Sequence, residues 1–269
     1  MRPSSGLKKG HSGKAKSWSR VRSITALVLR EMTARYGRSP GGYVWAILEP
    51  LGMIVVLAFG FALIMRTPAL GNSFLLFYAT GYLPYSLFQK LSNLIGTALN
   101  HSRTLLTYPA VLWLDPIIAR FLLHTMTELL VAFLLLNGIL LAIDGGTVLT
   151  FGPIFQAFAM AAFLGLGLGM VNCVIISAFP AWKSIWSVAT RPLFLASGVI
   201  LIYDVMPPIA QSILWYNPLM HISGIAREGF YPTYNPQYTS PVYVMIWIMV
   251  LLALGLLLIR RFHRQIINR

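Results

Sequence analysis

Six long apolar stretches divide the sequence, and short polar or proline-containing connections separate them. A helix needs about 20 apolar residues to cross the ~30 Å hydrocarbon core of a membrane. The stretches lack the period-two alternation that is typical of barrel strands, so they predict helices. The third stretch is too long for one straight crossing, so part of it should tilt strongly or lie at the inner surface. The expected spans are residues 43–65, 74–99, 110–143, 151–179, 185–203 and 242–259.

The predicted fold class is therefore all-α: a polytopic membrane protein with six transmembrane helices over residues 41–269. Residues 18–40 carry too many charges to cross the membrane. Turned by 100° per residue, their apolar side chains share one arc, which predicts a cytoplasmic amphipathic helix at the inner leaflet. Arg35 projects from this arc, where it either reaches lipid phosphates or meets an anionic substrate headgroup. Residues 1–17, rich in Ser, Gly and Lys, predict a flexible basic tail.

The segment before the last span holds two apolar pieces that are too short to cross. Pro207 and Pro208 precede the first piece, and Asn217 and Pro218 separate it from the second. We therefore expect two re-entrant or interfacial helices within residues 207–232, on the outer face.

Charge sets the orientation of the spans. The chain has 269 residues, of which only 10% are charged, with a net charge of +14. Such an apolar composition excludes an ordinary nucleic-acid-binding domain, although the balance is basic. Seventeen Lys and Arg residues fall on one predicted side, Lys183 and Arg191 among them, and only Arg66 and Arg227 on the other. By the positive-inside rule, both termini are cytoplasmic.

Charges inside the predicted spans are few. Lys90 and Arg120 are expected to snorkel toward the interface. Trp45 suits the headgroup level of the membrane, and Glu49 lies one helical turn deeper. Glu49 is either a transport residue or the partner of a nearby arginine that pins the fold.

Motifs for cofactor chemistry are missing from the sequence. Cys173 is the single cysteine, and the five histidines are scattered, so no metal site is expected. Gly13-Lys14 resembles the end of a phosphate-binding loop, but Lys8 and Ala15 break the motif. We therefore expect no cofactor in this chain.

Aromatic residues are abundant near both predicted faces. They form either the usual aromatic belt or a surface on which sugar rings pack. A conduit needs many weak contacts so that a polymer keeps moving. The candidates that flank the fifth span are Trp182, Trp186 and Tyr203. In addition, Gly165 and Gly169 form a small-residue motif that permits close helix contact, within one subunit or between two.

Several motifs carry a family resemblance. Residues 35–38 read Arg-Tyr-Gly-Arg, residues 42–45 Gly-Tyr-Val-Trp, and residues 49–50 Glu-Pro. Tyr-Ala-Thr-Gly-Tyr-Leu-Pro-Tyr follows at 78–85, Leu-Leu-Thr-Tyr-Pro at 105–109, Asn-Pro-Leu-Met-His at 217–221 and Arg-Glu-Gly-Phe-Tyr at 227–231. From about residue 18 on, the chain resembles type-2 ABC transporter permeases, above all those that export capsular polysaccharide. A departure is Ser39-Pro40-Gly41, where many relatives have Ser, apolar residues and one Gly.

The resemblance implies a homodimer with six spans per subunit in the bacterial inner membrane, coupled to two copies of a cytoplasmic ABC ATPase subunit. That ATPase would bind the ATP and Mg. The substrate would be a lipid-linked polysaccharide, passed on to periplasmic and outer-membrane export components. The connection after the second span would contact the ATPase through Ser102, Arg103 and Thr104. The substrate-binding candidates are Arg35, Arg38, Tyr43, Trp45, Glu49, Trp182, Trp186 and Tyr203, and those of an outer gate are Asn217, Arg227, Glu228 and Tyr231.

Other functions stay open at this point. A related permease could export another amphiphile, such as O-antigen, teichoic acid or a drug. An ion-coupled secondary transporter would need intramembrane carboxylates and repeated halves. The candidates for such carboxylates are Glu49, Asp115 and Glu128, and the sequence shows no repeat. A membrane-embedded sugar-modifying enzyme would need paired carboxylates or a Ser/His/Asp set, neither of which the sequence places near one face.

Overall fold

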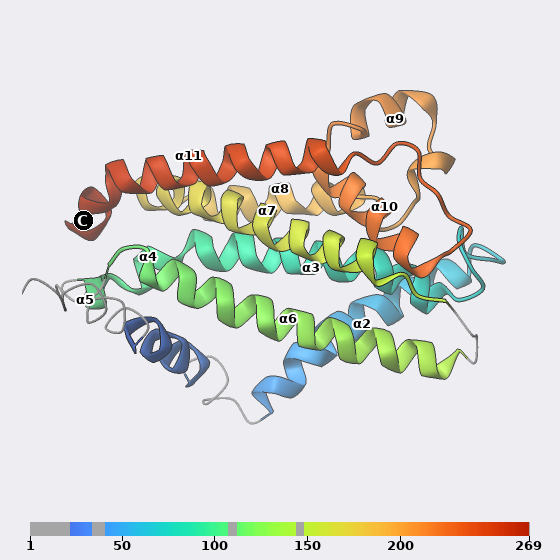
Figure 1. Ribbon diagram of the computed structural model, residues 1–269, viewed down its shortest axis with the longest axis horizontal. Coiled ribbons are helices and arrows are strands. Elements are labelled where there is room, and N and C mark those ends of the chain that lie inside the picture. Colours follow the sequence, from blue (N-terminus) through green and yellow to red (C-terminus); the bar gives the residue numbers. More distant parts are fainter. Residues whose placement is uncertain (1–21, 34–40, 107–111, 144–147, 269) are drawn as a thin grey trace, which may run out of the picture.

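The computed structural model describes residues 22–33, 41–106, 112–143 and 148–268, and it consists of helices and connections over these ranges. The long helices run side by side in an elongated bundle (Figure 1). They are α2 (Gly42–Ala62), α3 (Phe74–Gly96), α6 (Asp115–Ala142), α7 (Phe151–Ala178), α8 (Trp182–Leu195) and α11 (Pro241–Asn268). Five of them match a predicted span within a few residues at most ends; α11 runs on to Asn268.

Four helices of the described chain are both long and apolar enough to cross a membrane. They are Val44–Ala62, Asp115–Ala142, Phe151–Ala178 and Pro241–His263. The helix α3 is long but carries the polar run 89–93. Helix α6 is shorter than the predicted span 110–143. Its 28 residues still extend over about 42 Å and would have to tilt in a bilayer.

The predicted fifth span, residues 185–203, is wrong as a continuous helix. Helix α8 begins at Trp182 and ends at Leu195, so its 14 residues rise only about 21 Å. Pro192 removes one backbone donor near its end, and Gly198 adopts a φ of 72°, which a helix does not allow. The chain then continues through irregular structure to the short 3₁₀ helix η1 (Tyr203–Val205).

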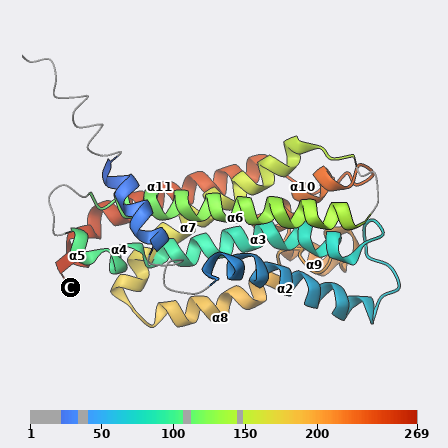
Figure 2. The same ribbon diagram turned by 90° about the horizontal axis from the view of Figure 1, so that it is seen from below.

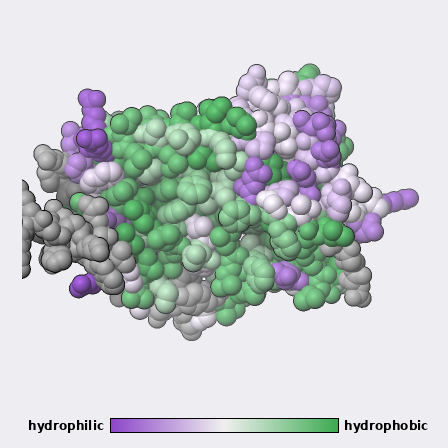
Figure 3. Space-filling model, viewed as in Figure 1, coloured by the Kyte–Doolittle hydropathy of each residue, from purple (hydrophilic) through white to green (hydrophobic). Residues whose placement is uncertain are grey.

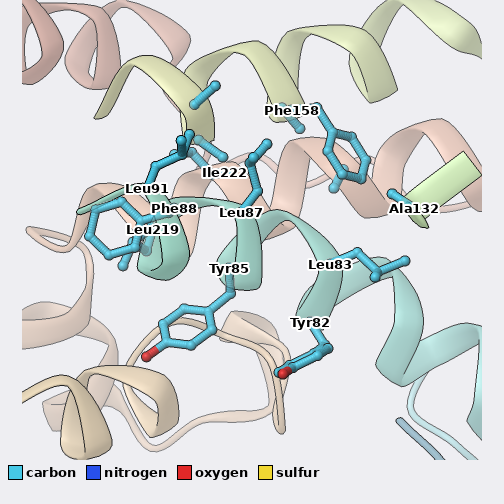
Figure 4. Packing of buried hydrophobic residues seen from close by; sticks show 14 of the residues in the cluster. Tyr82, Leu83, Tyr85, Leu87, Phe88, Leu91, Ala132, Phe158, Leu219 and Ile222 are labelled. Carbon is cyan, nitrogen blue, oxygen red and sulfur yellow. The ribbon is translucent and has the colours of Figure 1, made fainter. Parts of the chain in front are cut away.

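Helices α3 and α7 form the centre of the bundle. A Cβ on Gly165 would lie 2.9 Å from the carbonyl oxygen of Phe88, and one on Gly169 would lie 2.7 Å from Cβ of Ile95. The small-residue motif therefore packs α7 against α3 within one chain, which answers the question that the sequence left open. Figure 4 shows the side chains of α3 packed against residues of α6, α7 and α10.

The two ends of the bundle differ. One end holds helix 22–33, α4 (Ala98–His101), α5 (Arg103–Leu106) and the last turns of α11 (Figures 1 and 2). Arg120 joins helix 22–33 to α6, because its Nη2 lies 3.0 Å from Oε1 of Glu31. Its Nη1 also donates to the carbonyl oxygen of Leu94 at 2.9 Å, so Arg120 does not snorkel as the sequence predicted.

The other end carries α9 (Pro208–Leu214) and α10 (Pro218–Phe230), which confirms two short helices within residues 207–232. Both begin where the prolines predict. Helix α10 is almost wholly buried against α3 and α7, whereas α9 lies on the outside of the bundle (Figure 1).

Hydropathy follows the same long axis. On the face shown in Figure 3, hydrophobic side chains cover the middle of the molecule, and hydrophilic ones gather at the α11 end and around α9. Large apolar residues such as Phe59, Met126 and Phe155 are exposed along α2, α6 and α7. Such an apolar belt between two polar ends is the pattern that a bilayer requires.

Candidate functional site

A cavity of about 230 Å³ lies between α2, α3 and α8. Figure 2 shows α2 and α8 on the same side of α3. Its lining combines aromatic, polar and basic side chains: Met53, Tyr82, Tyr85, Gln89, Thr190, Arg191 and Phe194. It is smaller than the pockets that hold drug-sized ligands, and it is of a size for one sugar unit rather than for a large cofactor.

Packed aromatic rings form one wall of this cavity. Tyr82 and Tyr85 project from the same side of α3, opposite to Leu87 (Figure 4). Both rings meet Phe194 edge-on, with centroids 6.3 and 5.2 Å away. The Tyr85 hydroxyl donates to the carbonyl oxygen of Thr190 at 2.8 Å, which ties α3 to α8. The wall is therefore fixed before any ligand arrives.

The sequence placed Arg191 among the basic residues of the predicted cytoplasmic side, but the structure places it well inside helix α8. It is nine residues into α8, about 13 Å from the level of Trp182, and its side chain is exposed at the cavity. The sequence carried a signal for this position, because Arg191 falls inside the predicted span 185–203. A charge within a membrane span marks a functional position by default.

Lys90 joins two carboxylates beside this cavity. Its Nζ lies 3.0 Å from Oε1 of Glu128 on α6 and 3.5 Å from Oε2 of Glu49 on α2. The side chains of Lys90 and Glu128 are only 16% and 11% exposed, whereas Glu49 is 65% exposed. Glu49 therefore pairs with a lysine rather than with the predicted arginine, and Lys90 is held inside the bundle instead of snorkelling. The transport role of Glu49 stays a prediction.

The predicted aromatic candidates occupy separate places. Trp182 donates from Nε1 to Oδ1 of Asn172 at 3.0 Å, which fixes the start of α8 against α7. Trp186 is half-buried on the next turn. Tyr203 lies beyond α8, stacked on Tyr238 with ring centroids 4.1 Å apart. Trp45 is exposed on α2. These four residues do not line the cavity described above.

The remaining substrate-binding candidates are only partly described. Tyr43 belongs to α2, but its side chain lies outside the described part, as do Arg35 and Arg38 altogether. Their proposed contacts with a substrate headgroup stay predictions.

The three predicted coupling residues differ in accessibility. Ser102 lies between α4 and α5, and Arg103 and Thr104 begin α5, at the end of the bundle that also holds helix 22–33 (Figure 1). Thr104 is exposed, Arg103 is half-buried with its Nη2 3.2 Å from Oδ1 of Asn100, and Ser102 is buried. Thr104 is thus the side chain best placed to meet another protein.

Two of the predicted gate residues hold α10 to the irregular chain after α8. Oδ1 of Asn217 accepts the Leu219 N–H at 3.1 Å and caps α10, while its Nδ2 donates to the carbonyl oxygen of Ala196 at 2.8 Å. Arg227 is 1% exposed, and its guanidinium stands 4.3 Å from the ring centroid of Phe77. These contacts are structural, and a gating role stays a prediction.

The other two gate candidates lie at the end of α10. Glu228 is half-buried on α10, and Tyr231 is buried immediately after it. The Tyr231 ring fills the space beside Gly71, whose φ of 66° and missing Cβ allow the α2–α3 connection to approach. Burial raises the pKa of Tyr231 to about 12, so its hydroxyl stays neutral at physiological pH.

A second, larger cavity of about 420 Å³ lies between α6 and α7 and reaches Phe230. Its lining is apolar except for Asn137, whose Nδ2 donates to the carbonyl oxygen of Phe133 in the same helix at 2.7 Å. This lining suits hydrocarbon rather than a hydroxylated or charged ligand. The cavity beside α8 is therefore the better candidate for a polar substrate.

Among the described residues, no group of His, Cys, Asp and Glu side chains could hold a metal ion. The lining of the cavity beside α8 offers aromatic rings, the amide of Gln89 and the guanidinium of Arg191. Such a set of side chains can recognise and release a ligand.

Comparison with known proteins agrees with the resemblance seen in the sequence. The polysialic acid transport protein KpsM of Escherichia coli is 31% identical over 248 residues, which cover 91% of this chain and 96% of that protein. The capsule polysaccharide export inner-membrane protein CtrC of Neisseria meningitidis serogroup B is 29% identical over 91% of this chain and 92% of its own length. The O-antigen export system permease protein RfbA of Klebsiella pneumoniae is 23% identical over 87% of this chain and 90% of its own.

A family match also covers most of the chain. Residues 22–231 match the family described as ABC-2 type transporter. This range runs from helix 22–33 to the end of α10 and includes the cavity beside α8. The chain therefore belongs to the ABC-2 type transporter family.

Proposed function

We propose that this chain is the membrane subunit of an ATP-driven exporter that moves lipid-anchored capsular polysaccharide across the bacterial inner membrane. The similarity to capsule and polysialic acid exporters over nine-tenths of the chain carries this proposal. The O-antigen permease is less similar, at 23% identity, so O-antigen is the second choice of substrate.

The cavity between α2, α3 and α8 is the proposed part of the substrate path. The half-buried Phe194 offers a ring surface to sugars, the largely buried Tyr82 and Tyr85 complete the aromatic wall, and Gln89 offers an amide for hydroxyl groups. No deep, enclosed pocket is needed, because a polymer has to slide past each contact. Glu49, Trp45 and Arg191 extend this polar and aromatic surface along α2 and α8.

The proposed topology has six crossings, with both termini in the cytoplasm. Helix α3 is proposed as the second crossing, since Lys90 pairs with Glu128 on α6 and Glu49 on α2, and Ser92 is buried. Helix α8 and the irregular chain up to residue 202 supply the fifth, and Arg227 satisfies backbone carbonyls there. Helix 22–33 is proposed to lie along the inner leaflet, anchored through Glu31 to Arg120.

Energy for transport is proposed to come from a separate ATPase. Two permease chains would form the path, and two ATPase subunits would bind ATP and Mg. Helix 22–33, α4 and α5 would receive the movement of the ATPase, with Thr104 at the contact. Periplasmic and outer-membrane components would take over the polymer.

The test is complementation of a strain whose capsule permease gene has been deleted. Wild-type chain, expressed with its ATPase, should restore polysaccharide on the cell surface and remove the polymer that accumulates inside. The chain should also hold the ATPase during purification in mild detergent. Restoration of O-antigen export but not of capsule would select the second substrate, and transport that follows an ion gradient without ATPase would contradict the proposal.

A further inference from the structure

Arg191 stands out as a cation without a counter-charge beside the proposed path. In the ranges 22–33, 41–106, 112–143 and 148–268, its guanidinium makes no hydrogen bond or ion pair. Lys90 already pairs with the carboxylates of Glu49 on α2 and Glu128 on α6. A guanidinium kept at this depth without a protein partner is costly in a membrane unless a solvated path or a ligand meets it.

The surroundings of Arg191 select the kind of ligand. Arginine presents a planar fork of donors that fits the two oxygens of a carboxylate. In the same cavity the half-buried Phe194 offers a ring surface, the largely buried Tyr82 lines the wall, and Gln89 adds a donor and an acceptor. A flat ring that carries hydroxyl groups and one carboxylate satisfies all of these groups together.

We propose that the cavity beside α8 is a subsite for an acidic sugar, in which Arg191 binds the carboxylate and the aromatic wall packs against the sugar ring. This inference rests on the proposed export of polysaccharide and names the feature of the polymer that the path recognises. Arg191 then acts as a specificity-determining residue, because an exporter lacking it would accept neutral and acidic glycans alike.

The volume and rigidity of the cavity agree with a single unit of a chain. About 230 Å³ leaves room for one ring at a time, and the Tyr85–Thr190 hydrogen bond keeps the wall in place. A single charged contact on one side of an open surface gives selectivity and still lets the polymer move on.

The experiment measures how glycans stimulate ATP hydrolysis by the permease–ATPase complex in nanodiscs. Two matched probes are used: a lipid-linked oligoglucuronate and the same molecule after its carboxyl groups are reduced to hydroxymethyl groups. The variants are Arg191→Gln and Arg191→Lys. Lys183→Gln is the matched control, since Lys183 is an exposed cation on the same helix, outside the cavity.

The wild-type complex should respond to the acidic probe at a concentration roughly tenfold below that for the reduced probe, as expected for a charged hydrogen bond. Arg191→Gln should make the two probes equally effective by weakening the response to the acidic probe alone. Arg191→Lys should keep part of the preference for the acidic probe. Lys183→Gln should keep the wild-type ratio. Basal ATP hydrolysis and the elution volume show whether each complex is intact.

Three outcomes overturn the inference. An equal loss of the response to both probes in Arg191→Gln would assign Arg191 a structural role, for instance a contact with a second copy of the chain. A wild-type response that depends on the phosphate of the lipid anchor and not on the carboxylate would place the recognition elsewhere. A wild-type complex that responds to neither probe and exports no glycan would contradict the proposed function itself, and with it the subsite.

Discussion

Arg227 donates two hydrogen bonds into the chain where α8 has ended: from Nη1 to the carbonyl oxygen of Gly198 at 2.6 Å and from Nη2 to that of Val199 at 2.9 Å. Irregular chain lacks the regular backbone hydrogen bonds of a helix, and its carbonyl groups are costly to bury without donors. Arg227 supplies the missing donors from a helix 30 residues farther along. The break in the fifth predicted span and the burial of a cation therefore explain each other.

Replacing Arg227 by methionine should destabilise the protein strongly. The change leaves two buried carbonyl groups without donors, at about 1–3 kcal/mol each. It also removes the cation from the Phe77 ring. We expect a lower midpoint of thermal unfolding in detergent and less protein in the membrane. Arg66→Met is the control, because Arg66 is exposed, and it should change neither quantity. Equal stability of the two variants would contradict the role assigned to Arg227.

Replacing Lys90 by methionine should cost more than replacing Glu49 by glutamine. Lys90 and Glu128 are both largely buried, and breaking such a pair typically costs about 3–5 kcal/mol. Glu49 is 65% exposed, and pairs of that kind contribute about 0–1 kcal/mol.

A double-mutant cycle measures the Lys90 pair directly. Lys90→Met together with Glu128→Gln should recover much of the stability that Lys90→Met alone loses, because no buried carboxylate then lacks its lysine and Glu49 is exposed to solvent. Thermal melting in detergent gives the stability of the wild type, of the two single variants and of the double variant. Additive losses in the double variant would show that the pair contributes little.

Adding a methyl group at Gly165 should force α7 away from α3. The new Cβ would lie 2.9 Å from the carbonyl oxygen of Phe88, and backbone cannot yield as a side chain does. Gly165→Ala should therefore lower the stability by about 1–3 kcal/mol. Gly138→Ala on α6 meets no atom within 4 Å and should leave stability unchanged or raise it slightly. The comparison of the two melting midpoints decides whether the close contact exists.

The sequence predicted the short helices and most span ends correctly, because those depend on local signals. Prolines and Asn217 start α9 and α10 wherever the rest of the chain lies. The sequence prediction missed the end of α8 although Pro192 and Gly198 are local signals for it, whereas the donors that Arg227 brings from α10 follow only from the packing. The same holds for the site. A charge at Arg191 within a predicted span was visible, whereas its place at the cavity between α2, α3 and α8 follows only from the packing. Likewise, nothing local showed that Lys90 would lie between Glu49 and Glu128.

His221 should make the stability of the bundle end that carries α9 and α10 depend on pH. Its Nε2 lies 2.7 Å from the carbonyl oxygen of Trp215, to which it donates, and its Nδ1 accepts the Ser240 N–H at 3.1 Å. Both contacts suit the neutral ring, and burial lowers the pKa of His221 from its usual 6.5. Between the lowered pKa and 6.5, the unfolded chain binds a proton that the folded one does not, so stability falls as the pH drops below 6.5.

Thermal melting between pH 7.5 and 5 measures this dependence. His221→Gln keeps a donor and an acceptor but does not titrate, so its melting midpoint should fall less over this range than that of the wild type. The difference should appear below pH 6.5 and vanish above it, because both side chains are then neutral. Melting midpoints of wild type and variant that fall in parallel down to pH 5 would contradict this prediction. His221 would then bind a proton as readily in the folded as in the unfolded chain, and the hydrogen bond from Ser240 to Nδ1 would have to be absent.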